Sequence, residues 1–119
     1  MNSVTLHKIV RRHDLASVVK SGSLDVLATP IMIAWMEEAA CACLELDSEQ
    51  TSVGIFMQVS HDKASRLGQE VQVTATVTSI ENRKINFEVQ ATSEGEVIGK
   101  GIHSRFVVNA QKFMEKVNA

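Results

Sequence analysis

One segment of the sequence, residues 31–46, constrains the fold more than any other, because it is apolar on nearly every side and contains neither glycine nor proline. Its alanine, methionine and glutamate residues favour a helix. A helix with so narrow a polar stripe is usually buried rather than placed on a surface. Three small residues, Ala39, Ala40 and Ala42, would let another backbone approach it closely. The segment therefore predicts a buried central helix.

Two residues ahead of this segment indicate where the helix starts. Thr29 is a good N-cap, because its hydroxyl can accept a hydrogen bond from a backbone N–H of the first turn. Pro30 would then occupy the first helical position, where its missing N–H costs nothing. Upstream, the apolar residues between 4 and 10 predict a first strand, and residues 14–20 predict a short helical turn.

Beyond the polar loop 45–52, the hydrophobic period changes from that of a helix to that of a strand. The first strand of this part is expected to be mostly buried, whereas the second alternates regularly and is expected to be half-exposed. The predicted strands are residues 55–61, 71–78, 85–91 and 97–108, with turns at 82–84 and 94–96. Residues 110–117 are compatible with either a short helix or a frayed end.

One helix followed by long antiparallel strands predicts an α+β domain in which the sheet wraps around the helix. Such a sheet cannot cover a helix that is apolar on nearly every side and also protect its own edge. We therefore expect a second copy of the chain to complete the layer, as in the hotdog fold. Other small α+β sandwiches remain an alternative. The length of 119 residues fits a single domain, residues 1–119.

Composition and charge exclude several classes of function. A hydrophobic fraction of 45% argues against disorder, and a net charge of −2 argues against a nucleic-acid partner. One small basic cluster, Lys8, Arg11 and Arg12, fits either a solvated strand end or contact with the phosphates of a ligand.

The location of the protein is predicted from its cysteines and its apolar runs. Cys41 and Cys43 are two residues apart, so in a helix their side chains point roughly 200° apart and cannot bridge each other. A buried free thiol suits a reducing compartment. The N-terminus lacks the apolar core of a signal peptide, and the longest apolar run, residues 31–36, is too short to span a bilayer. We expect a cytoplasmic protein without a membrane partner.

Glu37 is the residue that breaks the pattern of the central helix. It lies about 100° around the helix from Glu38, toward the apolar side that includes Ile33 and Leu44. A carboxylate among apolar groups is costly unless it is hydrogen-bonded, paired or protonated, and such placement is typical of general bases. The alternatives are the edge of a wider polar stripe, or an ion pair at a dimer interface.

The histidines offer further candidates. His61 closes a predicted strand and is well placed for a cleft, although a lone histidine is more often an ordinary surface or core residue. His103 lies in a strand segment with two glycines, which often mark a bulge or a close backbone approach. The histidines show no metal-ligand spacing, so we expect no catalytic metal. No nucleophile elbow, phosphate loop or dinucleotide fingerprint is present.

Three stretches together resemble the fluoroacetyl-CoA thioesterase-like branch of the hotdog thioesterases. They are VLATPIMIAWMEEAA (residues 26–40), SVGIFMQVSH (52–61) and GKGIHSR (99–105). Each is moderately specific alone. In this order and spacing, across most of residues 26–106, they identify the chain as a member of that family.

The resemblance implies an acyl-CoA thioesterase, in which coenzyme A is part of the substrate and no separate cofactor is needed. It implies catalytic roles for Thr29, Glu37 and His61. Gly54 matches a glycine whose backbone lines the site, and Arg105 matches a family position for which substrate binding and a structural role are both open. In the family the site forms between subunits, so a homodimer is expected, and pairing into tetramers is left open.

The chemistry expected of these residues is hydrolysis of a small or medium acyl thioester. Glu37 and His61 would activate the nucleophile, and Thr29 would position the carbonyl or attack it. The fluoroacetate-selective lid of the family carries aromatic residues ahead of the helix, whereas residues 16–27 contain none, so a different acyl group is expected. A hotdog hydratase or dehydratase and a non-catalytic acyl-CoA-binding domain remain alternatives.

Overall fold

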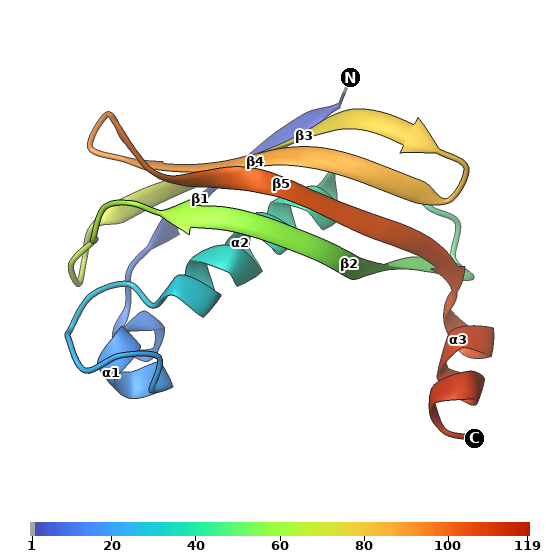
Figure 1. Cartoon of the computed structure of the whole chain (residues 1–119), viewed down its shortest axis with the longest axis horizontal. Coiled ribbons are helices and arrows are strands. Elements are labelled where there is room, and N and C mark those ends of the chain that lie inside the picture. Colours follow the sequence, from blue (N-terminus) through green and yellow to red (C-terminus); the bar gives the residue numbers. More distant parts are fainter. Residues whose placement is uncertain (1) are drawn as a thin grey trace.

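Five strands form one antiparallel sheet in the order β1-β3-β4-β5-β2 (Figure 1). The structure is a computed structural model that describes residues 2–119. The strands are β1 (Ser3–Ile9), β2 (Gln50–His61), β3 (Glu70–Glu81), β4 (Lys84–Ser93) and β5 (Glu96–Asn109). The central helix α2 (Thr29–Ala42) crosses the concave side of this sheet. The predicted α+β arrangement, a sheet wrapped around a helix, is confirmed.

The remaining helices are short. A 3₁₀ turn η1 (Arg12–Asp14) and α1 (Ala16–Val19) occupy the region where one helical turn was predicted. At the other end, α3 (Ala110–Val117) continues from β5, with the Asn109 side chain accepting a hydrogen bond from the Lys112 backbone. Of the two alternatives for this segment, the helix is correct. None of its residues is buried.

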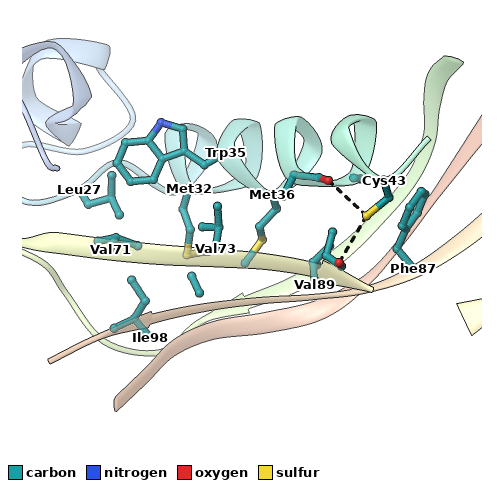
Figure 2. Packing of buried hydrophobic residues seen from close by; sticks show 14 of the residues in the cluster. Leu27, Met32, Trp35, Met36, Cys43, Val71, Val73, Phe87, Val89 and Ile98 are labelled. Carbon is teal, nitrogen blue, oxygen red and sulfur yellow. Dashed lines mark hydrogen bonds between the residues drawn. The ribbon is translucent and has the colours of Figure 1, made fainter. Parts of the chain in front are cut away.

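The core lies between α2 and the inner face of the sheet (Figure 2). Met32 and Met36 are fully buried and point from the helix toward the strands, where they meet valines of β3 such as Val73. Burying side chains of this size stabilises the fold by about 1.5–3 kcal/mol each. Cys43 closes the far end of this layer, where its Sγ contacts the carbonyl oxygens of Ala39 and Ala75 at 3.4 Å each.

Two predictions about the ends of α2 are wrong. Thr29 is the first helical residue rather than the N-cap, which is Ala28, and the Thr29 hydroxyl makes no capping hydrogen bond. The hydroxyl is instead engaged by His61 from β2. The helix also ends at Ala42 rather than at residue 46, and the backbone N–H of Cys43 closes the last turn. A local sequence pattern cannot show that a residue from elsewhere in the fold contacts the hydroxyl that would otherwise cap the helix.

The prediction that β2 is mostly buried is also wrong. The strand begins at Gln50, earlier than expected, and lies at the edge of the sheet, paired only with β5. Ile55 and Phe56 are 51% and 48% exposed. The pairing register shifts between Gly54 and Phe56, a bulge that changes which side chains face each side of the sheet. Ile55 and Phe56 are therefore largely uncovered by their own chain, whereas Met57 and Val59 pack partly against its core.

A single chain likewise covers only one side of α2. Trp35, Met36 and Ala40 are buried, whereas Ile33 and Glu37 are half-buried and Ala34 is exposed. The prediction of a helix buried on nearly every side is thus wrong for one chain alone. Within residues 2–119, no helix has the length and apolar character needed to cross a membrane.

Candidate active site

Thr29 and His61 meet at one end of the sheet. Thr29 opens α2 and His61 closes β2, and this end-to-end placement brings Thr29 Oγ1 within 2.7 Å of His61 Nδ1. The two residues are far apart in the sequence, and only the packing of α2 against the sheet joins them. The structure therefore brings together two of the three residues for which a catalytic role is predicted.

The His61 ring is set up to act as a neutral imidazole. Burial lowers the pKa of His61 below its usual value near 6.5, although the Asp62 carboxylate beside it opposes part of this shift. The other ring nitrogen, Nε2, is buried and has no hydrogen-bond partner among residues 2–119. A neutral imidazole that contacts a hydroxyl through one nitrogen and needs a partner on the other is typical of general base catalysis.

A cleft of about 360 Å³ opens beside this pair. Thr29 and His61 contribute to its wall together with the loops 21–24 and 62–64. Leu24 and Leu27 add apolar surface, and no aromatic side chain lines the cleft. Such a cavity can accept a small acyl group next to the hydroxyl and the imidazole.

Glu37 belongs to a second cluster. Its Oε2 accepts a hydrogen bond from Arg105 Nη1 at 3.1 Å, forming an ion pair in which the arginine side chain is 9% exposed and the glutamate side chain 40%. Arg105 also donates from Nε to Ser52 Oγ at 2.8 Å and from Nη2 to Ser52 O at 3.1 Å. Glu37 is thus paired within its own chain, and the alternative of an ion pair at a dimer interface stays a prediction.

Arg105 donates its hydrogen bonds to other groups of the protein. It is buried within the fold and holds Glu37 and Ser52 together. This placement favours the structural role that the sequence left open for Arg105. Its predicted substrate-binding role stays a prediction.

His103 is a member of this cluster to which the sequence assigned no role. Its Nδ1 lies 2.7 Å from the Phe56 carbonyl oxygen, its Nε2 lies 3.3 Å from Arg105 Nη1, and its ring stacks on Phe87. Burial lowers the pKa of His103, with the nearby Arg105 charge acting in the same direction. One signal in the sequence was available: residues 103 and 105 are two apart on a strand and so share a face.

Gly54 leaves space for the Glu37 carboxylate. A Cβ at this position would lie 2.7 Å from Glu37 Oε2 and 3.3 Å from Arg105 Nη1. A Cβ at Gly99 or Gly101 of β5 would also meet close neighbours, but there the neighbours include backbone atoms of β2. The close approach predicted for the glycines of β5 is therefore strand packing.

Within one chain, the two clusters are separate. Glu37 follows Thr29 by eight positions on α2, which corresponds to roughly 12 Å along the helix axis at 1.5 Å per residue. The structure thus does not bring Glu37 to Thr29 and His61 in a single protomer. Glu37 sits instead on the half-open side of α2, beside the edge strand β2.

Comparisons with known proteins place this geometry in a family. The family model for fluoroacetyl-CoA-specific thioesterases matches residues 10–111. The chain is 34% identical over 113 residues to a fluoroacetyl-CoA thioesterase of Streptantibioticus cattleyicolor, covering 93% of this chain and 81% of that protein.

Solved structures agree with this match. The fluoroacetyl-CoA thioesterase FlK superposes with a TM-score of 0.93 at 29% identity, over 98% of this chain and 92% of that chain. A hypothetical protein of Thermus thermophilus, described as a thioesterase superfamily member, shares the fold with a TM-score of 0.89 at 21% identity, over 98% of this chain and 88% of that one. The predicted hotdog fold and the predicted family are both confirmed, and the chain belongs to the family of fluoroacetyl-CoA-specific thioesterases.

Proposed function

We propose that this acyl-CoA thioesterase hydrolyses a small or medium acyl thioester at a site assembled from two subunits. Thr29 and His61 come from one subunit, and the carboxylate comes from Glu37 of the partner subunit. The observation that carries the proposal is the buried His61 Nε2, which has no acceptor or donor among residues 2–119.

Glu37 is suited to supply the missing partner. Only its Oε2 is engaged by Arg105, so Oε1 is left for another donor. The side chain is 40% exposed and lies on the side of α2 that its own chain leaves open. A carboxylate that accepts from Nε2–H would hold His61 in the tautomer whose Nδ1 accepts a proton from the Thr29 hydroxyl or from a water beside it.

The edge strand provides a way to bring the two clusters together. β2 exposes apolar side chains and an unpaired backbone edge, which is a template for pairing with another strand. Antiparallel pairing of two copies of β2 about a two-fold axis runs the two strands in opposite directions, so it brings the half of one strand that contains Gly54 toward the half of the other that ends at His61. Glu37, which lies against Gly54, moves with it toward the site of the partner.

These groups can move the protons that thioester hydrolysis requires. His61 removes a proton from the attacking water, or from Thr29 if the hydroxyl itself attacks, and the carbonyl becomes a tetrahedral oxyanion. The backbone N–H of Gly54 or the N-terminus of α2 stabilises this charge. Collapse of the intermediate breaks the carbon–sulfur bond, and the proton passes from His61 to the departing thiolate. Attack by water yields the free acid directly, whereas attack by Thr29 leaves an acyl-threonine ester, which a water activated by His61 then hydrolyses to regenerate the hydroxyl.

The acyl group differs from that of the fluoroacetyl-CoA relatives. No aromatic residue lines the cleft beside Thr29, and Leu24 and Leu27 leave a compact apolar wall for a short or medium chain. Both cysteines are free; Cys43 is buried as expected, whereas Cys41 is exposed. Free thiols support a cytoplasmic location.

A panel of acyl-CoA thioesters, assayed with a thiol reagent, tests the activity and finds the preferred chain. We expect release of free CoA, and Glu37→Gln should lower kcat by about 10²–10⁴-fold because the general base loses its carboxylate support. Glu38→Gln is the matched control, since Glu38 is exposed and, among the residues that the structure describes, pairs only with Lys8.

Three results would count against the proposal. An enoyl thioester instead of free CoA would indicate dehydration, and saturable binding without turnover would indicate a non-catalytic domain. Parental turnover by Glu37→Gln would remove Glu37 from the mechanism.

A further inference from the structure

We propose that His103 is a positioning residue of the active site, which acts through Arg105 to hold the Glu37 carboxylate in place. This inference rests on the proposed function, because it assumes that Glu37 takes part in the reaction. His103 does not reach the cleft beside Thr29. It contributes by fixing the guanidinium that binds Glu37.

The hydrogen bonds determine which nitrogen of His103 carries the proton. The Phe56 carbonyl oxygen, 2.7 Å from Nδ1, can only accept, so Nδ1 is the donor. In the neutral ring, Nε2 then holds a lone pair. This lone pair faces Arg105 Nη1 at 3.3 Å, and a guanidinium nitrogen can only donate. The pairing of β2 with β5 therefore sets the tautomer of His103, and the tautomer provides an acceptor for Arg105.

This acceptor completes the set of contacts that orients the guanidinium. Nε and Nη2 are held by Ser52, and Nη1 is shared between Glu37 and His103. Each of the two hydrogens on Nη1 thus has a partner. Without the His103 acceptor, Nη1 can turn away from Glu37, and the carboxylate loses its fixed position.

The arrangement requires a neutral His103. A protonated ring would present an N–H to the guanidinium instead of a lone pair, and would push Arg105 away from Glu37. Among the described residues, the charged groups that face the ring are Arg105 on its own strand and Glu37 on α2. From β2 and β4 it meets the Phe56 carbonyl and the Phe87 ring, neither of which titrates. Burial lowers the pKa of His103, which keeps the ring neutral at ordinary pH.

Two substitutions separate the contacts of His103. In His103→Asn, the amide can still donate to the Phe56 carbonyl, but nothing accepts from Arg105. In His103→Gln, the longer amide can accept from Arg105, but the bond to Phe56 is lost. We expect kcat to fall on the order of tenfold or more in His103→Asn with little change in KM, and most of this loss to be recovered in His103→Gln. The opposite ranking, with the glutamine variant less active, would assign His103 to strand pairing alone.

A double-mutant cycle with Glu37→Gln tests whether the effect passes through Glu37. If His103 acts by holding this carboxylate, His103→Asn lowers kcat in the parent and has no further effect in the Glu37→Gln background. An equal loss in both backgrounds would overturn the inference.

The pH profile gives a readout that does not depend on His103→Asn folding. Because the folded pKa of His103 is lowered, its protonation sets in only as the pH falls below about 6.5. The parent should therefore lose kcat/KM more steeply on the acid side than His103→Gln, while His61 titrates in both. Superimposable profiles would contradict the inference. If Glu37→Gln itself keeps full activity, the proposed function fails; if only His103→Asn keeps it, the inference alone fails.

Discussion

At the scale of single residues, the position of the Glu37 carboxylate is decided by its neighbours Arg105 and Gly54. Arg105 supplies a buried positive partner, and Gly54 supplies the space into which the carboxylate fits. The sequence pointed to Glu37 because its helical phase is anomalous. It could not show that the anomaly is resolved by an arginine from a distant strand.

Gly54→Ala should lower activity without unfolding the protein. The added Cβ would lie 2.7 Å from Glu37 Oε2, the mobile end of a flexible side chain, so the carboxylate moves rather than the backbone. We expect kcat to fall by on the order of tenfold, and the free energy of unfolding to change by less than about 1 kcal/mol. Steady-state kinetics and urea denaturation measure the two effects. Parental kcat, or a large loss of stability, would show that Gly54 does not serve this purpose.

At the scale of elements, α2 and α3 depend on their surroundings to different degrees. α2 buries methionines and alanines against the sheet, whereas every residue of α3 remains at least partly exposed. The apolar period of residues 31–46 was enough to predict α2, and the change of period was enough to predict the strands. The apolar run of β2 led to a wrong prediction of burial. Such a run has the same pattern whether the surface that covers it belongs to the same chain or to another.

The two methionines Met36 and Met114 provide a matched test of this difference. Met36 is fully buried between α2 and the sheet, whereas Met114 on α3 is 49% exposed. Met36→Ala should lower the free energy of unfolding by about 2–5 kcal/mol, because it removes apolar contacts and leaves a cavity. Met114→Ala should change it by roughly 0.5 kcal/mol or less. Similar losses in urea denaturation would mean that α3 is packed as firmly as α2.

At the scale of the whole molecule, the proposed site is divided between two chains. Thr29 and His61 lie at one end of β2, Glu37 lies beside its middle, and β2 forms an open edge. In the proposed dimer, a two-fold axis through this edge would complete two sites from two chains. The predicted homodimer remains a prediction, and it can be tested through function.

Mixing two inactive variants should restore activity if the site is shared. A dimer of Glu37→Gln with His61→Gln contains one site built entirely from unaltered residues. Random reassociation of equal amounts should recover about a quarter of parental activity, since half the dimers are mixed and each has one of two sites intact. Activity after co-refolding measures this recovery.

The control for this experiment mixes Thr29→Ala with His61→Gln. Both altered residues belong to the same half of the site, so every dimer lacks a complete site and no activity should return. Failure of the first mixture would place all three residues in one subunit. Activity in the second mixture would mean that Thr29 and His61 of one site come from different subunits, which would contradict their contact within one chain.

The sequence by itself determined the class of fold, the family and the residues to consider, because each depends on local patterns: a helical period, alternating strands and short motifs in order. The tertiary structure decided how those residues are joined. The Thr29 hydroxyl contacts His61 rather than capping the helix backbone, and Glu37 pairs with Arg105. His103 joins this second cluster through Arg105. The contacts of Thr29 with His61 and of Glu37 with Arg105 link residues 32 and 68 positions apart in the sequence. Their geometry follows from strand register and helix packing, which no local pattern contains.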